Sequence, residues 1–297
     1  MARRRPLAQE RERRGLFGLN PALMLDGIMA KELASDWDPE LYGRFRRYRA
    51  EPVEAILKRL ELSDRERIVD LGCGSGENTI ELARRSANGS ALGIDSSPTM
   101  IDRANQLRAT LDPPLAARAR FVVGELPGSI ANDNYTLVFS NATIHWLGDH
   151  RGVFRRCFQA LAQGGKLVVQ MPANDEEVAK LAMRQLASEA PWSEKVRGAI
   201  DELPPVPPPE HYAAMLSELG FAGVDCYYQT FAHPMNSPAE VIEWYSSTGL
   251  RPYLKALTEA ERPEFLATLT ARLESAYGTD GKLTFHFRRL FIWARRP

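Results

Sequence analysis

The residues with the clearest chemical pattern form a short loop between two apolar segments. The chain reads Ile68-Val-Asp-Leu-Gly-Cys-Gly-Ser-Gly76, so an apolar run ends at Asp70 and glycines follow at alternate positions. A second apolar run, Ala91-Leu-Gly-Ile-Asp95, ends in another acid nineteen residues after Gly76. Glycine permits a turn tight enough for a ligand to lie on the backbone, and the second acid suits a ribose hydroxyl pair. The pattern predicts a bound cofactor that carries adenosine.

The spacing of the glycines distinguishes between such cofactors. A dinucleotide loop, Gly-x-Gly-x-x-Gly, places a pyrophosphate on a helix N-terminus. Here the glycines are Gly72, Gly74 and Gly76, and Glu77 occupies the third dinucleotide position. A carboxylate there repels a pyrophosphate but tolerates a sulfonium and an ammonium, which disfavours a nicotinamide-dependent oxidoreductase. The run Asp-x-Gly-x-Gly-x-Gly resembles the signature of class I methyltransferases that use S-adenosyl-L-methionine. Because the full set of glycines and acids is present, a non-catalytic cofactor-binding protein is also disfavoured.

Composition excludes several classes of protein. The 297 residues include 38 Lys plus Arg and 38 Asp plus Glu, so no net charge draws the chain to nucleic acid or an acidic membrane. No apolar run approaches the roughly 20 residues that span a bilayer. Cys73, Cys157 and Cys226 are scattered, which fits a reducing compartment without a disulfide or zinc framework. We therefore expect a cytoplasmic enzyme with no metal site.

The elements that position the glycine loop alternate between two kinds of pattern. Short apolar runs predict strands, and stretches with a period near 3.6 residues predict helices. We expect strands at 67–71, 90–95, 119–123, 137–140 and 166–170, and helices at 41–60, 77–85, 98–107 and 154–161, the last ending at Gly-Gly 164–165. This alternation predicts a Rossmann-like, doubly wound α/β fold whose parallel sheet is covered on both faces.

The two ends of the chain depart from this alternation. Residues 1–14 contain six arginines and two glutamates, and 1–34 form a basic arm. The arm is either frayed or contains a short helix at 21–33, packed over the active-site mouth or against a second subunit in a homodimer. Residues 35–297 form the catalytic domain, with further strands at 224–231 and 284–294. Helical segments at about 174–220 and 238–278 are candidate cap or lid elements.

Several segments beyond the glycine loop resemble the trans-aconitate 2-methyltransferases. The likeness covers the chain from about residue 35 to its end. The segments are Ser35-Asp-Trp-Asp-Pro-Glu-Leu-Tyr42, Gly93-Ile-Asp-Ser-Ser-Pro-Thr-Met100, Asn141-Ala-Thr-Ile-His-Trp-Leu-Gly-Asp-His150, Gln170-Met-Pro-Ala-Asn174, Thr248-Gly-Leu-Arg-Pro-Tyr-Leu254 and Phe287-Arg-Arg-Leu-Phe291. The resemblance implies a seven-stranded sheet with a helical lid. It also implies methyl-ester formation on one carboxylate of a small polyacid such as trans-aconitate.

The chain departs from the family pattern at three positions near the expected acceptor. Ala173 replaces an acid, Glu51 replaces an arginine and Arg288 stands where proline is common. Together with a Trp- and Tyr-rich insertion, these changes keep an alternative open, in which the same fold methylates a hydrophobic acid, an acyl-carrier-bound acid or an isoprenoid carbon. Methylation of nucleic acid is disfavoured, because there is neither a basic face nor an Asn/Asp-Pro-Pro-Tyr motif.

The motifs assign roles to individual residues. The expected cofactor contacts are Arg49, Asp70, Gly72, Gly74, Gly76, Asp95, Ser96, Met100, Glu125, Leu126 and Asn141. The expected acceptor-side residues are Tyr42, His145, Trp146, Arg251 and Arg289, the two arginines as bidentate carboxylate clamps. Each acceptor-side residue, and Arg49, also has a purely structural interpretation as a core or surface side chain. Because a carboxylate is already ionised at neutral pH, transfer to it requires alignment rather than a general base.

Overall fold

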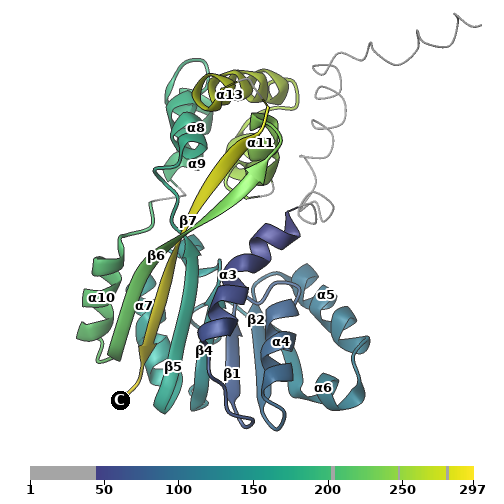
Figure 1. Cartoon of the computed structure of the whole chain (residues 1–297), viewed down its shortest axis with the longest axis vertical. Helices are drawn as coiled ribbons and strands as arrows, with labels where there is room; N and C mark the ends of the chain where they lie inside the picture. Colours follow the sequence, from purple (N-terminus) through teal and green to yellow (C-terminus); the bar gives the residue numbers. More distant parts are fainter. Residues whose placement is uncertain (1–44, 202–204, 247, 279–280) are drawn as a thin grey trace, which may run out of the picture.

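The computed structural model describes residues 45–201, 205–246, 248–278 and 281–297 (Figure 1). The basic arm, the expected helix at 21–33 and Tyr42 therefore lie outside the described residues. Within the described part of the chain, no helix combines the length and apolarity needed to cross a membrane.

The centre of the fold is a seven-stranded sheet with the order β3-β2-β1-β4-β5-β7-β6. Five strands run parallel, and β7 pairs antiparallel with both β5 and β6. The strands are β1 (Arg67–Leu71), β2 (Ser90–Asp95), β3 (Ala119–Val123), β4 (Tyr135–Asn141), β5 (Leu161–Pro172), β6 (Ala222–Met235) and β7 (Leu283–Arg295). Strand order reverses between β1 and β4, the switch point where ligands of such sheets bind. The expected Rossmann-like, doubly wound α/β fold with seven strands is confirmed.

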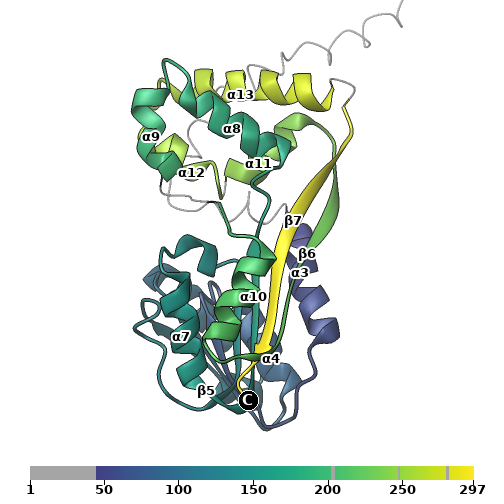
Figure 2. The same ribbon diagram turned by 90° about the vertical axis from the view of Figure 1, so that its left-hand side faces the viewer.

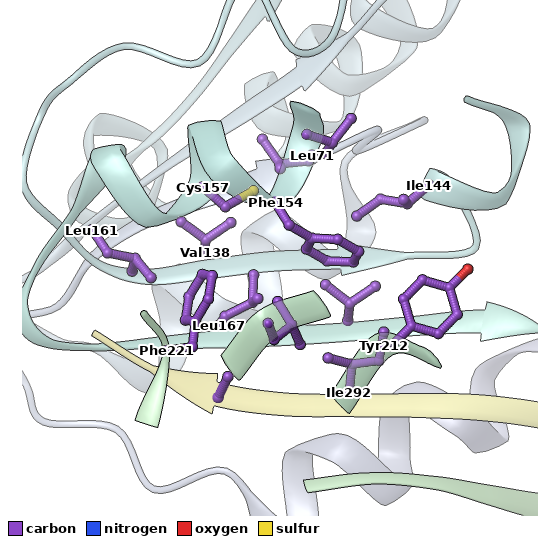
Figure 3. Close-up of a cluster of buried hydrophobic side chains, with 14 of the residues drawn as sticks. Leu71, Val138, Ile144, Phe154, Cys157, Leu161, Leu167, Tyr212, Phe221 and Ile292 are labelled. Carbon is purple, nitrogen blue, oxygen red and sulfur yellow. The ribbon is translucent and has the colours of Figure 1, made fainter. Parts of the chain in front are cut away.

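Helices cover both faces of this sheet. The helices α3 (Arg46–Arg59), α4 (Glu77–Arg85), α5 (Pro98–Ala109) and α6 (Pro113–Arg118) share a buried apolar cluster with one face. The helices α7 (His150–Ala160) and α10 (Pro209–Glu218) share another cluster with the opposite face. Figure 3 shows this second cluster, in which Phe154, Tyr212 and Ile292 meet from α7, α10 and β7. Burial on both faces explains why the strands read as continuous apolar runs.

A second layer of helices stands above the carboxyl edge of the sheet (Figures 1 and 2). The strands β6 and β7 extend beyond the sheet towards this layer as a long, twisted antiparallel pair. The layer contains α8 (Val178–Ser188), α9 (Ser193–Asp201), α11 (Pro238–Ser246), α12 (Arg251–Ala256) and α13 (Arg262–Tyr277), which we call the cap. Its core holds Trp244, Tyr245, Tyr253, Phe265 and Phe285, all buried.

A buried polar cluster fixes the cap to the end of β5. The Asn174 side-chain amide donates to the Tyr245 hydroxyl, and the Tyr245 hydroxyl donates to Glu177 Oε2 at 3.2 Å. The Tyr277 hydroxyl donates to the other Glu177 oxygen. Residues from the loop after β5, α11 and α13 thus share one hydrogen-bond network, which sets the position of the cap over the sheet.

Several sequence-based boundaries differ from the structure by a few residues, and two differences have a clear physical reason. We expected a helix at 154–161 and, after Gly-Gly 164–165, a strand at 166–170, but α7 spans His150–Ala160 and β5 already begins at Leu161. The cause is long-range, because the Gly164 amide donates to the Arg296 carbonyl at 2.8 Å and the Arg296 amide to the Gly165 carbonyl at 2.9 Å. In addition, α10 packs on the sheet and not with the cap helices, so the cap comprises α8, α9 and α11–α13.

Candidate active site

Four polar side chains line the carboxyl edge of the sheet on the face that α3 and α4 cover. Paired residues of neighbouring strands point to the same face, and so do residues two apart along one strand. Asp70 pairs with Phe139, so Asp70 and Asn141 share a face. Asn141 pairs with Gln170, and Gln170 pairs with Phe291, two residues from Arg289. The row from β1 to β7 is therefore Asp70, Asn141, Gln170 and Arg289.

The glycine loop lies at one end of this row. Gly72, Gly74 and Gly76 have φ of 70°, 54° and 89°, a region that residues with side chains rarely adopt. A Cβ on Gly72 would overlap the Thr143 side chain, and a Cβ on Gly76 would lie 2.7 Å from Phe121 Cζ. Nothing lies within 4 Å of the corresponding position on Gly74. The loop is packed from below and open at Gly74, as required for a ligand that rests on bare backbone.

Asp70 is a buried acid at the base of the loop. Its side chain is 1% exposed, and Thr79 Oγ1 donates to its Oδ2 at 2.6 Å. Burial raises its pKa from 3.8 to about 7, with the Thr79 hydrogen bond opposing the rise and the charge of Asp95 adding to it. A cation placed beside Asp70 would favour the ionised form. The site therefore suits an ammonium group.

Asp95 holds the loop from the end of β2. Its Oδ2 accepts from the Gly74 amide at 2.9 Å, and its Oδ1 accepts from the Ser97 amide at 2.9 Å. Each carboxylate oxygen has about two lone-pair sites, so one on each remains for further donors. Two donors on neighbouring carbons, such as ribose hydroxyls, match this arrangement.

The expected adenine neighbours cluster around Asp95. Ser96 is exposed, and Met100 is half-buried in the first turn of α5. The Gly124 amide donates to the Asp95 carbonyl at 2.9 Å, which brings exposed Glu125 and half-buried Leu126 to the same side of the loop. The structure thus assembles all of these residues near the end of β2.

Two side-chain amides further along the row each have one buried polar atom without a hydrogen bond to the described residues. Within the described part of the chain, neither Asn141 Oδ1 nor Gln170 Nε2 has a hydrogen-bond partner. An unsatisfied buried polar atom costs about 1–3 kcal/mol, so such a pair is typical of a ligand site. One acceptor and one donor beside Asp70 match an amino acid moiety with an ammonium and a carboxylate. The residues therefore fit S-adenosyl-L-methionine.

His145 and Trp146 follow β4 in a short 3₁₀ turn (Ile144–Trp146). Burial, followed by the charges of Lys180, Arg289 and His150, lowers the pKa of His145 to about 3. His145 is therefore neutral at physiological pH, and its Nδ1 has no partner among the described residues. Trp146 is 50% exposed, so it does not belong to the core.

Arg289 occupies the end of the row opposite the glycine loop. It is 5% exposed, and its guanidinium carbon lies 4.6 Å from the centre of the Phe287 ring. Its Nη1 donates to Gln170 Oε1 at 3.5 Å. Arg289 is buried inside the fold, so the alternative in which it forms a salt bridge on the surface is wrong.

Glu51 brings a negative charge close to Arg289. Burial raises the pKa of Glu51, while the charges of Arg47 and Arg289 lower it. Its Oε2 also lies 3.6 Å from Nδ1 of His233, which is fully buried. Burial and then Arg289 lower the pKa of His233 to about 4, so this contact is not an ion pair at neutral pH. Glu51 thus partly offsets the charge of Arg289.

The other expected cations lie nearer the cap. Arg49 Nη2 donates to the Trp244 carbonyl at 3.4 Å, and its guanidinium lies 5.1 Å from the Trp244 ring centre. These contacts place the Arg49 side chain between α3 and α11. Arg251 is half-buried at the first position of α12. The roles of Arg49 at the cofactor and of Arg251 at the acceptor stay predictions.

Sequence reasoning missed several residues of this region. Thr79 and Thr143, which contact Asp70 and the glycine loop, had a usable signal, because each is a polar residue at a buried position beside the motif. Gln170 ends an apolar strand and had a similar signal. Lys180 in α8 had none, because a lysine in an amphipathic helix is ordinarily a surface residue.

Two of the family departures contact each other. The Arg288 Nε donates to the Ala173 carbonyl at 2.8 Å, and the Ala173 amide donates to the Arg288 carbonyl at 3.0 Å. Arg288 Nη2 also pairs with Glu176 Oε2 at 3.0 Å. The Arg288 side chain therefore braces the loop after β5, on the face of β7 opposite Arg289.

Comparison with protein families gives a match to a model described as a methyltransferase domain, over residues 42–225. Among curated proteins, the trans-aconitate 2-methyltransferase of Paracidovorax citrulli is 36% identical over 265 residues, covering 88% of this chain and 98% of that protein. The trans-aconitate 2-methyltransferase of Yersinia pseudotuberculosis is 35% identical over 261 residues, covering 87% of this chain and 98% of that protein.

Solved structures share the fold at low sequence identity. The YcgJ protein of Bacillus subtilis gives a TM-score of 0.55 at 14% identity, covering 82% of this chain and 97% of that one. A Haemonchus contortus phosphoethanolamine N-methyltransferase 2 in complex with S-adenosyl-L-methionine gives 0.51 at 19% identity, covering 82% and 52%. At these identities the likeness establishes the fold alone.

Proposed function

Because the chain belongs to the trans-aconitate 2-methyltransferase family, we propose that it transfers a methyl group to one carboxylate of trans-aconitate or a closely related polyacid. The single observation that carries this proposal is the polar row. It leads from an acidic cofactor end at Asp70 to a buried cation, Arg289, below the cap. Donor and acceptor ends of a carboxyl methyltransferase require these opposite charges.

The enzyme uses S-adenosyl-L-methionine, which supplies a methyl group already activated by its attachment to a sulfonium. We assign Asp70 and Asn141 to the ammonium of the bound cofactor, and the open backbone at Gly74 to the methionine chain. Asp95 is assigned to the ribose hydroxyls, and Ser96, Met100, Glu125 and Leu126 to the surroundings of the adenine. Placing a negative Asp70 beside a positive ligand offsets the cost of burying both charges.

Little acid–base chemistry is required of the protein at the acceptor end. An acceptor carboxylate is ionised at neutral pH, so it attacks without losing a proton to the enzyme. Neutral His145 suits this role, since it offers a hydrogen bond without competing for a proton. Holding the carboxylate in line with the methyl group supplies most of the rate, and such alignment is worth roughly 7–11 kcal/mol.

The alternative acceptors, namely hydrophobic acids, acyl-carrier-bound acids and isoprenoid carbons, rested on the Trp- and Tyr-rich insertion and on departures from the family such as Glu51. In the structure Trp244, Tyr245 and Tyr253 are 2–3% exposed and form the core of the cap. Their abundance is therefore explained by packing. The aromatic content of the cap is thus no reason to prefer an apolar acceptor.

We also propose that the cap, with α8, α9 and α11–α13, is a subdomain of the catalytic domain 35–297. Tyr42 is proposed to cover the reacting methyl group. Three free cysteines support a reducing, cytoplasmic location.

The basic arm at 1–34 is proposed to mediate a homodimer. Light scattering tests the proposed dimer by comparing the full chain with a variant that lacks residues 1–34. The proposal requires the full chain to be a dimer and the variant to be a monomer.

A substrate screen with isotopically labelled S-adenosyl-L-methionine tests the function. The acceptors are trans-aconitate, citrate-like acids, a medium-chain fatty acid and a prenyl diphosphate. We expect label to enter trans-aconitate or another polyacid as an alkali-labile methyl ester. Label only in the fatty acid or the prenyl compound would refute the proposed acceptor while leaving the methyltransferase assignment intact.

A further inference from the structure

One lysine of the cap lies close in the chain to the carboxyl edge of the sheet. Lys180 lies in the first turn of α8, shortly after the carboxyl end of β5. Its side chain reaches the turn before α12, where a methyl group on Gly249 would lie 3.5 Å from Lys180 Nζ. Arg251 begins α12 two residues later. Two cationic residues thus occupy one side of the cap.

The ammonium of Lys180 lacks a counter-ion in the described part of the chain. No ion pair or hydrogen bond joins its Nζ to another described residue. Asp175 is the acid whose charge raises the pKa of Lys180. Both Asp175 oxygens already have partners, because Arg184 Nη2 binds Oδ1 at 3.1 Å and the Val206 amide donates to Oδ2 at 3.1 Å. Burial lowers the pKa of Lys180. Burying a charge without a partner is costly, so such a group normally meets an anion.

The charges of Lys180 and Arg289 both act on His145. The charges of both residues lower the pKa of His145, after burial. Lys180 belongs to the cap, Arg289 to the sheet, and His145 to the turn after β4. The space around His145 is therefore electropositive, and it lies beside the row that holds the cofactor end. An anion between cap and sheet would be attracted by both cations.

We propose that Lys180 is a specificity-determining residue that binds a carboxylate of the acceptor, opposite Arg289. The proposal rests on the proposed function, since it concerns the carboxylates that are not methylated. Lys180 and Arg289 each bind one of these, and the remaining carboxylate is left facing the methyl group. A monoacid satisfies only one of the two cations, so the site selects polyacids.

The test compares Lys180→Met with Lys255→Met, which removes an exposed cation from α12 of the same cap. Calorimetry measures the affinity of each protein for trans-aconitate in the presence of S-adenosylhomocysteine, and for S-adenosylhomocysteine alone. Steady-state kinetics give KM and kcat, and Tm reports folding. Lys180→Arg is the conservative variant.

We expect Lys180→Met to weaken trans-aconitate binding and raise KM about 10- to 100-fold, as for loss of a charge-assisted hydrogen bond. Its affinity for S-adenosylhomocysteine and its Tm should match the wild type, and Lys180→Arg should recover part of the loss. Acid binding within twofold of the wild type, or an equal loss in Lys255→Met, would overturn the inference. Lowered Tm with proportionally weakened cofactor binding would show a structural role instead. If the wild type neither binds nor methylates any polyacid, the proposed function itself is wrong, and this inference falls with it.

Discussion

The two ends of the polar row differ in how the chain assembles them. At the cofactor end, Asp70, the three glycines and Thr79 come from one strand, one loop and one helix within ten residues. At the acceptor end, Glu51, His145, Lys180 and Arg289 come from α3, the turn after β4, α8 and β7. The first end is a local motif, and the second exists only after the sheet and cap have folded.

The two ends also differ in charge and in hydrogen bonding. The cofactor end is acidic, and its carboxylates are held by the Thr79 hydroxyl and by loop amides. The acceptor end is basic, with the partial exception of Glu51 beside Arg289. Opposite charges at the two ends suit a cationic donor and an anionic acceptor. The comparison predicts that substitutions at one end should leave binding at the other end nearly unchanged.

The largest effect is expected for Asp70→Asn. The amide keeps the shape and an oxygen for Thr79, but it removes the charge that favours an ammonium. We expect a loss of affinity for S-adenosyl-L-methionine of about 100-fold, measured by calorimetry, at the upper end of the range for a charged hydrogen bond of about 1.5–3 kcal/mol. Asp102→Asn, at an exposed position on α5, is the control.

The same variant tests the electrostatic account through its stability. The pKa of Asp70 is raised on folding from 3.8 to about 7, so ionisation of Asp70 opposes folding. The stabilising contribution of the protonated form is complete below about pH 4 and is lost as the pH rises through 7. At pH 8 the Tm of Asp70→Asn should equal or exceed that of the wild type. A large fall in Tm would contradict this account.

A smaller effect is expected for Arg251→Ala at the acceptor end. The change should raise KM for trans-aconitate about tenfold and lower kcat by less, because the guanidinium acts on a remote carboxylate. Cofactor affinity should stay within twofold. Lys255→Ala on the same helix is the control, and an equal response of both variants would argue against a carboxylate clamp.

The pH dependence of cofactor binding separates the two ends further. The ligand ammonium requires ionised Asp70, which becomes protonated as the pH falls through about 7. Affinity for S-adenosyl-L-methionine should therefore fall about fivefold between pH 7 and pH 6 and about tenfold per pH unit below pH 6, and binding should release a proton. Asp70→Asn should bind weakly and without this pH dependence. A pH-independent wild type would place the ammonium elsewhere.

The smallest effect is expected for Glu51→Gln. Removing this carboxylate frees Arg289 from a competing negative charge, so KM for trans-aconitate should decrease about two- to fivefold, in the range of a partly exposed charge pair. Glu54→Gln, exposed on the same helix, should leave KM unchanged. An increase in KM for Glu51→Gln would mean that Glu51 itself holds the acceptor.

The same contrast explains how far the sequence alone could predict the molecule. Strands β1, β2 and β3 and helix α4 have the expected bounds, because each is set by local apolar periodicity and by glycines or caps. The start of β5 was expected at Lys166 but lies at Leu161, because pairing with Arg296 brings the Gly-Gly segment into the strand. The paired residues are more than 130 positions apart in the chain, so no local sequence pattern predicts their contact.

The site follows the same division. The motif predicted the glycine loop, Asp70 and Asp95, because the spacing of these residues along the chain determines which cofactor they can bind. The contact of Arg49 with Trp244 of α11 was not expected from the sequence, and its role at the cofactor stays a prediction. Lys180 and Glu51 gain their surroundings from helices that pack on distant strands, so their types and positions in the sequence say little about what they contact.

The most direct test of the whole account is a crystal structure of the protein with S-adenosylhomocysteine and trans-aconitate bound together. The account predicts adenosine beside Asp95, the amino acid moiety over Asp70 and Asn141, and acceptor carboxylates within hydrogen-bond distance of Lys180 and Arg289. Trans-aconitate bound outside the space between sheet and cap, with Lys180 and Arg289 contacting only protein atoms, would contradict it.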